Sequence, residues 1–143
     1  GFGSMPQKIL EQLIEYVKET KVNGVPLSQN PIIRHKLAEM AIEIAVARLL
    51  AYRVAWVQAT NQDVTSVGAI IKLYGSEMMQ RVSATGLEIL GLYSQLVPGS
   101  KWAKLAGNIT RDYMWNLSIT IAGGTSEIQR IIIATQGLGL PRM

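Results

Sequence analysis

The sequence contains no cysteine and only one histidine among its 143 residues. Without cysteine the chain can form neither a disulfide nor a zinc–thiolate site, which suits a reducing compartment and favours a cytoplasmic location. The single histidine, His35, has no carboxylate or cysteine directly beside it in the sequence. We therefore expect neither a metal site nor a catalytic histidine.

Charged residues are also scarce, at 17% of the chain against roughly 25% in a typical globular domain. The net charge of +4 is spread along the chain without a basic run, which argues against nucleic-acid binding. The longest apolar stretch, residues 41–59, contains Glu43, Arg48 and Arg53. Such charges are costly in a bilayer, so no membrane span is expected. The low charge leaves extra apolar surface, which indicates a partner or a neighbouring domain.

Residues 1–4 read as a short expression remnant before a starting methionine at Met5, and no secretory signal is visible. Apolar residues then recur at helical spacing in five segments separated by short connections, with no alternating strand pattern. The sequence therefore predicts an all-α fold: an up-down four-helix bundle with a short extra C-terminal helix. The expected helices cover about 6–20, 31–60, 65–92 and 100–122, and a last one begins at Thr125 or Ser126.

Two of these segments have signals that set their ends or their surroundings. Asn30 followed by Pro31 is a strong helix start, and Asp63, Thr65 or Ser66 can cap the third helix. The second helix carries a second apolar face that includes Ile42, Val46, Leu49 and Leu50, so it is either central in the bundle or shared with another subunit. The third helix contains Gly68, Gly75 and Gly86, which reflect either close approach of a neighbour or simple tolerance.

Common catalytic motifs are absent from the sequence. There is no Gly-x-Ser-x-Gly elbow, no phosphate-binding loop with its lysine, and no dinucleotide fingerprint after a strand. The most unusual stretch is "IAGGTSEIQR" at 121–130, where two glycines precede a capping box in which Ser126 caps and Gln129 reaches back. Glu127 suits the positive end of the helix dipole. The glycines indicate either a tight interhelix turn or a place where a ligand touches the backbone.

The amino-acid sequence of this stretch resembles that of a known protein family. "GGTSEIQRIIIATQGLGLPR" is similar to the closing signature of the acyl-CoA dehydrogenases, and "NGVPLSQNPIIRHKLAEMAIEIAVARLLAYRVAW" resembles the turn and long helix that precede it in that family. The resemblance covers nearly everything from Leu10 to Met143. It implies that residues 5–143 are the C-terminal helical domain, with the N-terminal and middle domains absent from this chain.

The resemblance also implies a function in lipid metabolism and fatty acid β-oxidation. The family's enzymes use FAD to remove hydrogens from the α and β carbons of an acyl-CoA thioester, and they pass the electrons to an electron-transfer flavoprotein. The helical bundle supplies homo- or hetero-oligomer contacts and part of the flavin pocket. Alone, this domain is expected to be inactive, because the acyl-CoA cleft needs the missing domains.

The family's site residues can be carried over position by position. Gly123 stands where many members have the glutamate that removes the α-proton, so no catalytic residue is expected in this chain. The family's Arg-x-x-Phe-Gly turn reads Thr20 to Gly24, and its Gln-x-x-Gly-Gly motif reads Glu88 to Leu92. The expected flavin contacts are Gly124, Thr125, Ser126 and Glu127, together with Lys21, Asn30, Arg34, Glu88 and Gly91.

These departures leave two alternatives beside the enzyme domain. One is a catalytically silent assembly subunit or interaction module that has lost the base and some FAD contacts. The other is an independent helical bundle that matches the signature by chance.

Overall fold

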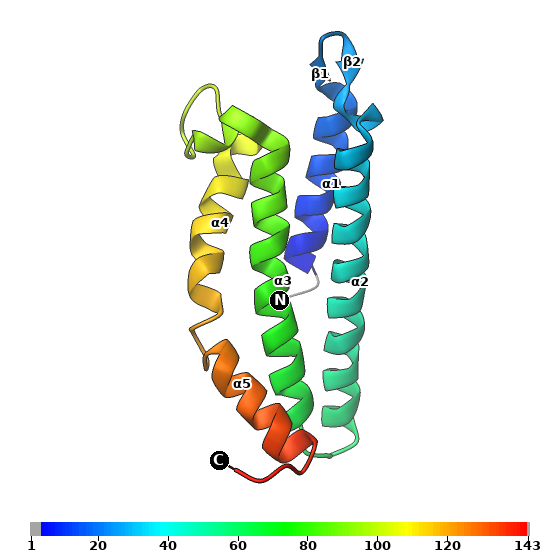
Figure 1. The fold of residues 1–143 in the computed structure, drawn as a ribbon, viewed down its shortest axis with the longest axis vertical. Coiled ribbons are helices and arrows are strands. Elements are labelled where there is room, and N and C mark those ends of the chain that lie inside the picture. The colour runs from blue at the N-terminus through cyan, green and yellow to red at the C-terminus, as the bar shows by residue number, and fades with distance from the viewer. Residues whose placement is uncertain (1–3, 143) are drawn as a thin grey trace.

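The computed structural model describes residues 4–142 and has the predicted architecture. Four helices form the bundle and a short fifth helix extends the last of them along the lower half of α3 (Figure 1). The all-α prediction is therefore confirmed. Residues 1–3 of the predicted expression remnant lie outside the described residues, and the domain boundary at Met5 stays a prediction. The helices are α1 (Ser4–Glu19), α2 (Pro31–Ala59), α3 (Thr65–Leu90), α4 (Asn108–Ile119) and α5 (Ser126–Ile132).

The core lies around α3, which contacts each of the other four helices. Its buried side chains Met78 and Val82 pack in one cluster with Leu13 of α1, Ile44 of α2 and Ile109 of α4. Burying an aliphatic side chain of this size is worth about 1.5–3 kcal/mol. The cluster therefore fixes the helices that carry the candidate site residues.

The start of α2 follows the predicted local signal, whereas the N-cap position of α3 is Val64, without a side-chain cap hydrogen bond, and not the predicted Asp63, Thr65 or Ser66. The Asn30 side chain accepts hydrogen bonds from the N–H groups of Ile32 and Ile33 at 2.9 and 3.4 Å, and Pro31 opens the helix. Asp63 accepts both the hydroxyl and the N–H of Thr65, at 2.6 and 3.0 Å. The two bonds, that from the hydroxyl first, favour the charged carboxylate and hold the pKa of Asp63 below its ordinary value.

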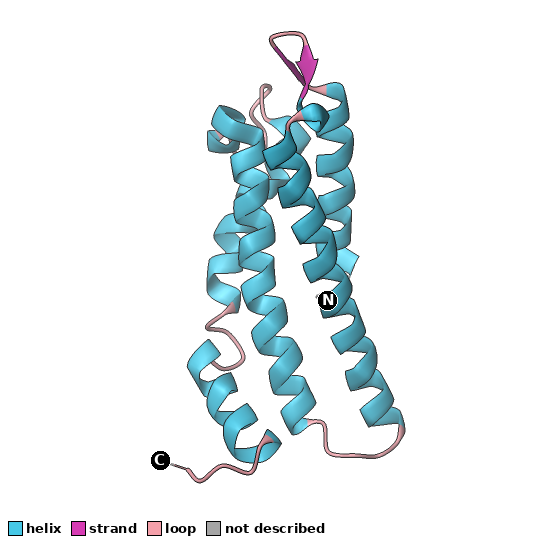
Figure 2. Cartoon of the chain, turned by 45° about the vertical axis from the view of Figure 1, so that its right-hand side comes forward, coloured by secondary structure: helices cyan, strands magenta, loops and turns pink. Residues whose placement is uncertain are grey.

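The turn between α1 and α2 contains a small hairpin that the sequence pattern did not predict. Strand β1 (Lys21–Val22) pairs antiparallel with β2 (Val25–Pro26). Asn23 and Gly24 between them have positive φ angles of 50° and 82°, the backbone that a two-residue Asn-Gly hairpin requires. Figure 2 shows that these strands stand at one end of an otherwise helical molecule.

The predicted start of the fourth helix was wrong. The sequence pattern placed it near Ser100, whereas α4 begins at Asn108. Immediately before it, Leu105, Ala106 and Gly107 have φ angles of 50°, 55° and 70°. Three successive left-handed residues cannot belong to a right-handed helix, so the apolar spacing in this segment does not reflect a helix face.

A close backbone contact explains this long connection. A Cβ atom on Gly107 would lie 2.5 Å from the backbone nitrogen of Pro98, so the loop closes tightly on itself only with glycine there. Trp102, which lies in the segment from residue 100 that the sequence pattern placed in the fourth helix, is 66% exposed.

Two of the interior glycines of α3 have different explanations, one the close approach of a neighbouring helix and the other simple tolerance. A Cβ on Gly86 would lie 2.8 Å from Cγ2 of Ile109, so the close approach of α4 accounts for this residue. A Cβ on Gly68 would meet nothing within 4 Å, and that position is one of simple tolerance.

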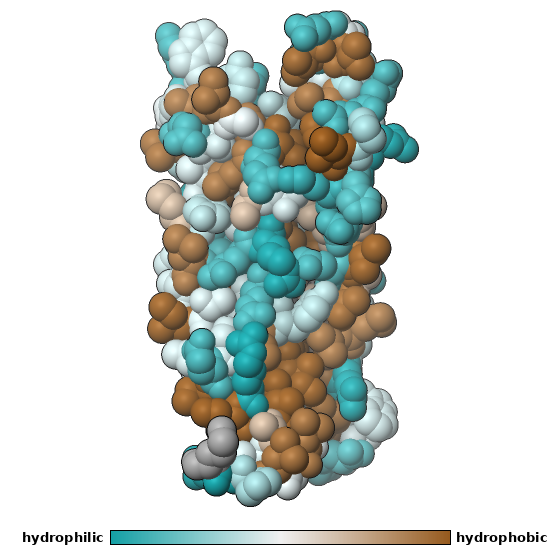
Figure 3. Space-filling model, in the orientation of Figure 1, coloured by the Kyte–Doolittle hydropathy of each residue, from teal (hydrophilic) through white to brown (hydrophobic). Residues whose placement is uncertain are grey.

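The second apolar face of α2 is not covered within one copy of the chain. Ile42, Val46 and Leu49 are 64%, 37% and 67% exposed, and Trp56 is also exposed. Hydrophobic side chains gather over the lower half of the face shown in Figure 3. Hence α2 is not central in its own bundle, and its second apolar face is open within one copy of the chain. Within residues 4–142 no helix is both long and apolar enough to cross a membrane.

Candidate functional site

The first group of expected site residues lies in the turn between α4 and α5. Thr125 caps α5, because its hydroxyl oxygen accepts the N–H of Ile128 at 3.3 Å. Ser126 is buried, and its N–H donates to the carbonyl of Thr120 at 3.1 Å. The predicted capping role of Ser126 was therefore wrong by one residue.

Gln129 has a different partner from the one that the capping box predicts. Its side-chain amide donates to the carbonyl oxygens of Gly123 and Gly124, at 3.2 and 3.4 Å, instead of reaching the N–H of the cap. A carbonyl in a partly buried turn needs such a donor, because an unpaired carbonyl away from water costs free energy. An exposed N–H group, in contrast, can form its hydrogen bond with water. Gln129 is buried and lies on α5, so these bonds tie the turn to the helix that follows it.

Both glycines of the turn have left-handed backbones. Gly124 has a φ of 98°, a conformation that favours glycine, and a Cβ there would lie 2.6 Å from Nε2 of Gln129 and displace the end of that side chain. Gly123 has a φ of 69° and open space around the position of a Cβ. It has no side chain that could transfer a proton.

Glu127 presents a charged carboxylate beside this turn. Its pKa lies below the ordinary value, chiefly because the carboxylate accepts a hydrogen bond from its own backbone N–H and then because it accepts one from Thr125. The charges of Arg130 and Lys72 lower the pKa further. Arg130 in turn pairs with Glu77 of α3 at 2.8 Å and ties α5 to that helix.

Lys72 of α3 is part of this group, although no sequence motif pointed to it. Its ammonium donates to the carbonyl of Thr120 at 3.3 Å and to the carbonyl of Gly124. These partners lie 48 and 52 residues further along the chain, so only the packing of α3 against the turn reveals them.

The second group of expected residues lies at the other end of the bundle, near the hairpin (Figure 1). Lys21 is in β1, Asn30 caps α2, and Arg34 in the first turn of α2 donates to the carbonyl of Ser28 at 3.2 Å. Glu88 is in the last turn of α3, and Gly91 follows it with a φ of 58°. The structure thus brings these residues of α2, α3 and the hairpin to one end.

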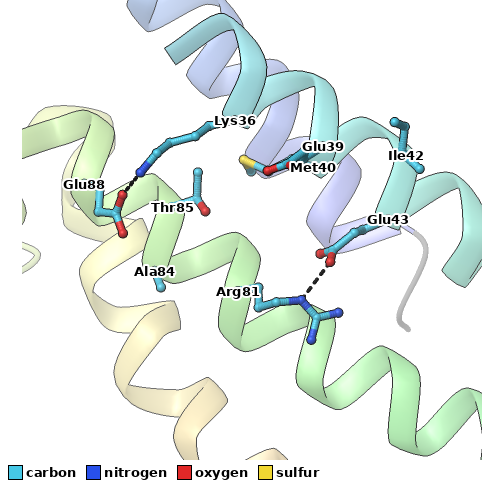
Figure 4. A pocket seen from close by; sticks show the side chains of 9 residues that line it. All are labelled: Lys36, Glu39, Met40, Ile42, Glu43, Arg81, Ala84, Thr85 and Glu88. Atoms are coloured by element: carbon cyan, nitrogen blue, oxygen red, sulfur yellow. Dashed lines mark hydrogen bonds and ion pairs between the residues drawn. The ribbon is translucent and has the colours of Figure 1, made fainter. Parts of the chain in front are cut away.

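Glu88 is balanced by a cation that sequence reasoning missed. Lys36 of α2 forms an ion pair with it across an open groove of about 590 Å³ between α2 and α3 (Figure 4). In the same groove Arg81 and Glu43 are 2.7 Å apart. A carboxylate in such a pair is less repulsive to a ligand phosphate than the isolated glutamate of the sequence.

The two groups are far apart within one copy of the chain. Lys72, which touches the first group, and Glu88, in the second, are sixteen positions apart on α3, which corresponds to about 24 Å at 1.5 Å per residue. The structure therefore brings the expected residues into two clusters and does not unite them around one ligand.

The single histidine has a partner one helical turn away. His35 Nε2 lies 3.3 Å from the carboxylate of Glu39, and both side chains are largely exposed. Among the described residues, no three His, Asp or Glu side chains are placed to hold a metal ion.

Comparison with known proteins gives a consistent match. The family profile described as "Acyl-CoA dehydrogenase, C-terminal domain" matches residues 3–138. The probable acyl-CoA dehydrogenase YngJ of Bacillus subtilis is 37% identical over 130 residues, which are 91% of this chain and 32% of that protein. The caffeyl-CoA reductase–Etf complex subunit CarC of Acetobacterium woodii is 29% identical over 128 residues, which are 90% of this chain and 32% of that protein.

A solved structure has the same fold. The ChsE4–ChsE5 complex from Mycobacterium tuberculosis superposes with a TM-score of 0.90 at 28% identity, over 96% of this chain and 35% of that one. The chain thus spans about a third of the length of the relatives that it matches.

Proposed function

The chain belongs to the acyl-CoA dehydrogenase family, as its C-terminal domain, and we propose that it is the helical part of an FAD-dependent enzyme that oxidises an acyl-CoA thioester between its α and β carbons. The proposal rests on the match of the family profile to residues 3–138, together with the turn at 123–127, which hydrogen bonds of Thr125 and Gln129 hold in place. FAD, when bound, supplies the acceptor for the hydride. The acyl-CoA and its cleft belong to domains outside this chain.

We assign this chain's residues two separate tasks in such an enzyme. Gly124, Thr125 and Glu127 contact the flavin of their own subunit, and buried Ser126 supports the turn from beneath. Lys21, Asn30, Arg34, Glu88 and Gly91 serve the flavin of a neighbouring copy, since about 24 Å separates the two clusters. Two observations on the residues support a fit to a dinucleotide: Lys36 balances the charge of Glu88, and the space around Gly91 is open.

The exposed face of α2 supports the assembly that this division requires. Ile42, Val46 and Leu49 lie one helical turn apart and form a single apolar stripe. An apolar stripe of this spacing is the kind of surface that packs against a helix of another subunit. We propose that it does so in an oligomer of the complete protein, with an electron-transfer flavoprotein as a further partner.

The test uses the complete gene product that contains this chain. We expect it to purify with FAD, and we expect a series of acyl-CoA esters of increasing length to reduce that flavin in the absence of oxygen, read as loss of its visible absorbance. Protein that contains no flavin, takes up none and reduces no added acceptor with any ester would refute the enzyme proposal.

A second function follows from Gly123, which has no side chain where many family members have their base. It is a catalytically silent subunit of a hetero-oligomer, in which another subunit supplies the base. Co-expression with genes of family members from the same genome separates the two proposals. Activity that appears only in the mixed complex favours the silent subunit, whereas activity of the homo-oligomer excludes it.

A further inference from the structure

Lys72 stands out because its ammonium donates hydrogen bonds to backbone carbonyls of a turn about 50 residues away in the sequence. It lies on α3 and is half-buried, and its ammonium is bonded to the carbonyl oxygens of Thr120 and Gly124. Thr120 directly follows α4, so its carbonyl belongs to the negative end of that helix. A lysine there satisfies carbonyls that no intrahelical N–H can reach.

The partners of Lys72 are shared with the rest of the turn. The carbonyl of Thr120 also accepts the N–H of Ser126 at 3.1 Å, and the carbonyl of Gly124 also accepts the amide of Gln129 at 3.4 Å. The carbonyl of Gly123 accepts the same amide at 3.2 Å. Three carbonyls of the turn therefore point their oxygens toward one cation and one amide.

The direction of these carbonyls fixes the direction of the N–H groups. In a trans peptide the C=O and the following N–H point to opposite sides, and none of the described peptides is cis. The inward carbonyls of Gly123 and Gly124 thus turn the N–H groups of Gly124 and Thr125 away from Lys72. Within residues 4–142, neither of these N–H groups donates to a backbone carbonyl.

A glycine pair has no side chains to hold such an orientation by itself. Gly123 and Gly124 both adopt left-handed backbones, and glycine visits many alternatives at similar energy. The peptide between Gly124 and Thr125 could therefore rotate if its carbonyl lost its strongest donor. A hydrogen bond from a charged donor is roughly twice as strong as a neutral one.

We propose that Lys72 is a positioning residue that locks the peptide planes of the Gly123–Gly124 turn, so that Gly124 and Thr125 present their backbone to the flavin in one orientation. The flavin part of this inference rests on the proposed function. The locking itself concerns only the chain and is measured without a cofactor.

The first experiment measures amide hydrogen exchange of the chain by NMR. Lys72→Met should accelerate exchange at the N–H groups of Ser126 and Ile128 by about tenfold or more, which corresponds to the loss of one charged hydrogen bond. Lys72→Arg should retain most of the protection. The matched control is Lys18→Met, which removes an exposed lysine paired with Glu15 and should change neither amide.

The exchange rates of Ser126 and Ile128 show whether Lys72 holds the turn in one orientation. Exchange at Ser126 and Ile128 in Lys72→Met that equals the exchange in Lys18→Met overturns the proposal. If Lys72→Met fails to fold, Lys72→Gln removes the charge and keeps only a shorter, neutral amide donor group, and the same comparison applies to it. Acceleration confined to the turn, with α1 unchanged, supports the proposal.

The second experiment measures FAD binding by the complete gene product. We expect Lys72→Met to weaken FAD binding by about tenfold and to alter the visible flavin spectrum, Lys72→Arg to restore both, and Lys18→Met to affect neither. A wild-type protein that binds no FAD refutes the proposed function and leaves the exchange result standing. FAD binding and spectrum that are unchanged in Lys72→Met, beside accelerated exchange, refute the flavin part of the proposal.

Discussion

Replacing Gly86 by alanine should destabilise the bundle, although alanine is the better helix former. The gain in helix propensity is worth up to about 1 kcal/mol. Against it, the new methyl would lie 2.8 Å from Cγ2 of Ile109, which is 1% exposed. This atom sits on a branched Cβ with one stiff torsion, so it cannot move away alone.

The expected size of the effect follows from these two opposing terms. Overpacking a well-filled core costs about 1–3 kcal/mol. Because Ile109 is fully packed and its Cγ2 cannot move alone, the cost lies in the upper part of this range, at about 2–3 kcal/mol. After the gain in propensity of up to about 1 kcal/mol, we expect Gly86→Ala to lower the free energy of unfolding by about 1–2 kcal/mol, or the melting temperature by about 3–6 °C. Gly68→Ala is the matched control on the same helix. Its Cβ meets nothing within 4 Å, so it should stabilise by about 0.5–1 kcal/mol.

Urea denaturation followed by circular dichroism measures both variants. A Gly86→Ala variant as stable as the parent, beside a Gly68→Ala control that behaves as expected, would refute the close approach of α3 and α4. A double-mutant cycle with Ile109→Ala localises the clash. The double variant should be less destabilised than the sum of the single ones by about 1 kcal/mol, because the methyl introduced by Gly86→Ala then has room.

Three further predictions concern other parts of the molecule. Asn30→Ala should lower the free energy of unfolding by about 1 kcal/mol, and Asn30→Asp should retain most of it, in the same urea assay; equal loss in both would contradict the cap. The pKa of Asp63 is lowered on folding, so its contribution is present above its ordinary value of 3.8 and is lost as the pH falls through the lower folded value; Asp63→Asn should therefore flatten the acid side of the stability curve. Leu49→Glu should weaken self-association in sedimentation equilibrium by about tenfold without lowering the melting temperature of the monomer, and unchanged association would count against the α2 stripe.

Local signals in the sequence predicted the fold where a few neighbouring residues decide the conformation. Asn30 with Pro31 marked the start of α2, and both apolar faces of α2 were visible from spacing alone. The start of α4 could not be predicted in this way. It depends on the tight contact of Gly107 with Pro98, which no pattern of apolar residues encodes.

The candidate site was predictable as residue types but not as geometry. The family signature pointed to the turn at 123–127, yet the structure caps α5 with Thr125 and pairs Gln129 with glycine carbonyls, and the capping-box pattern predicted neither. Lys36 and Lys72 were missed for a common reason. Each acts on a residue about 50 positions away, and such pairings exist only after the helices pack.

The separation of the two clusters has a genetic consequence. If each flavin pocket takes one end from one subunit and the other end from its neighbour, two defective alleles can complement each other. A subunit damaged at Thr125 and a subunit damaged at Glu88 would together form one pocket with both defects and one with none. Activity would then return in cells that carry both alleles, although neither allele alone supports it.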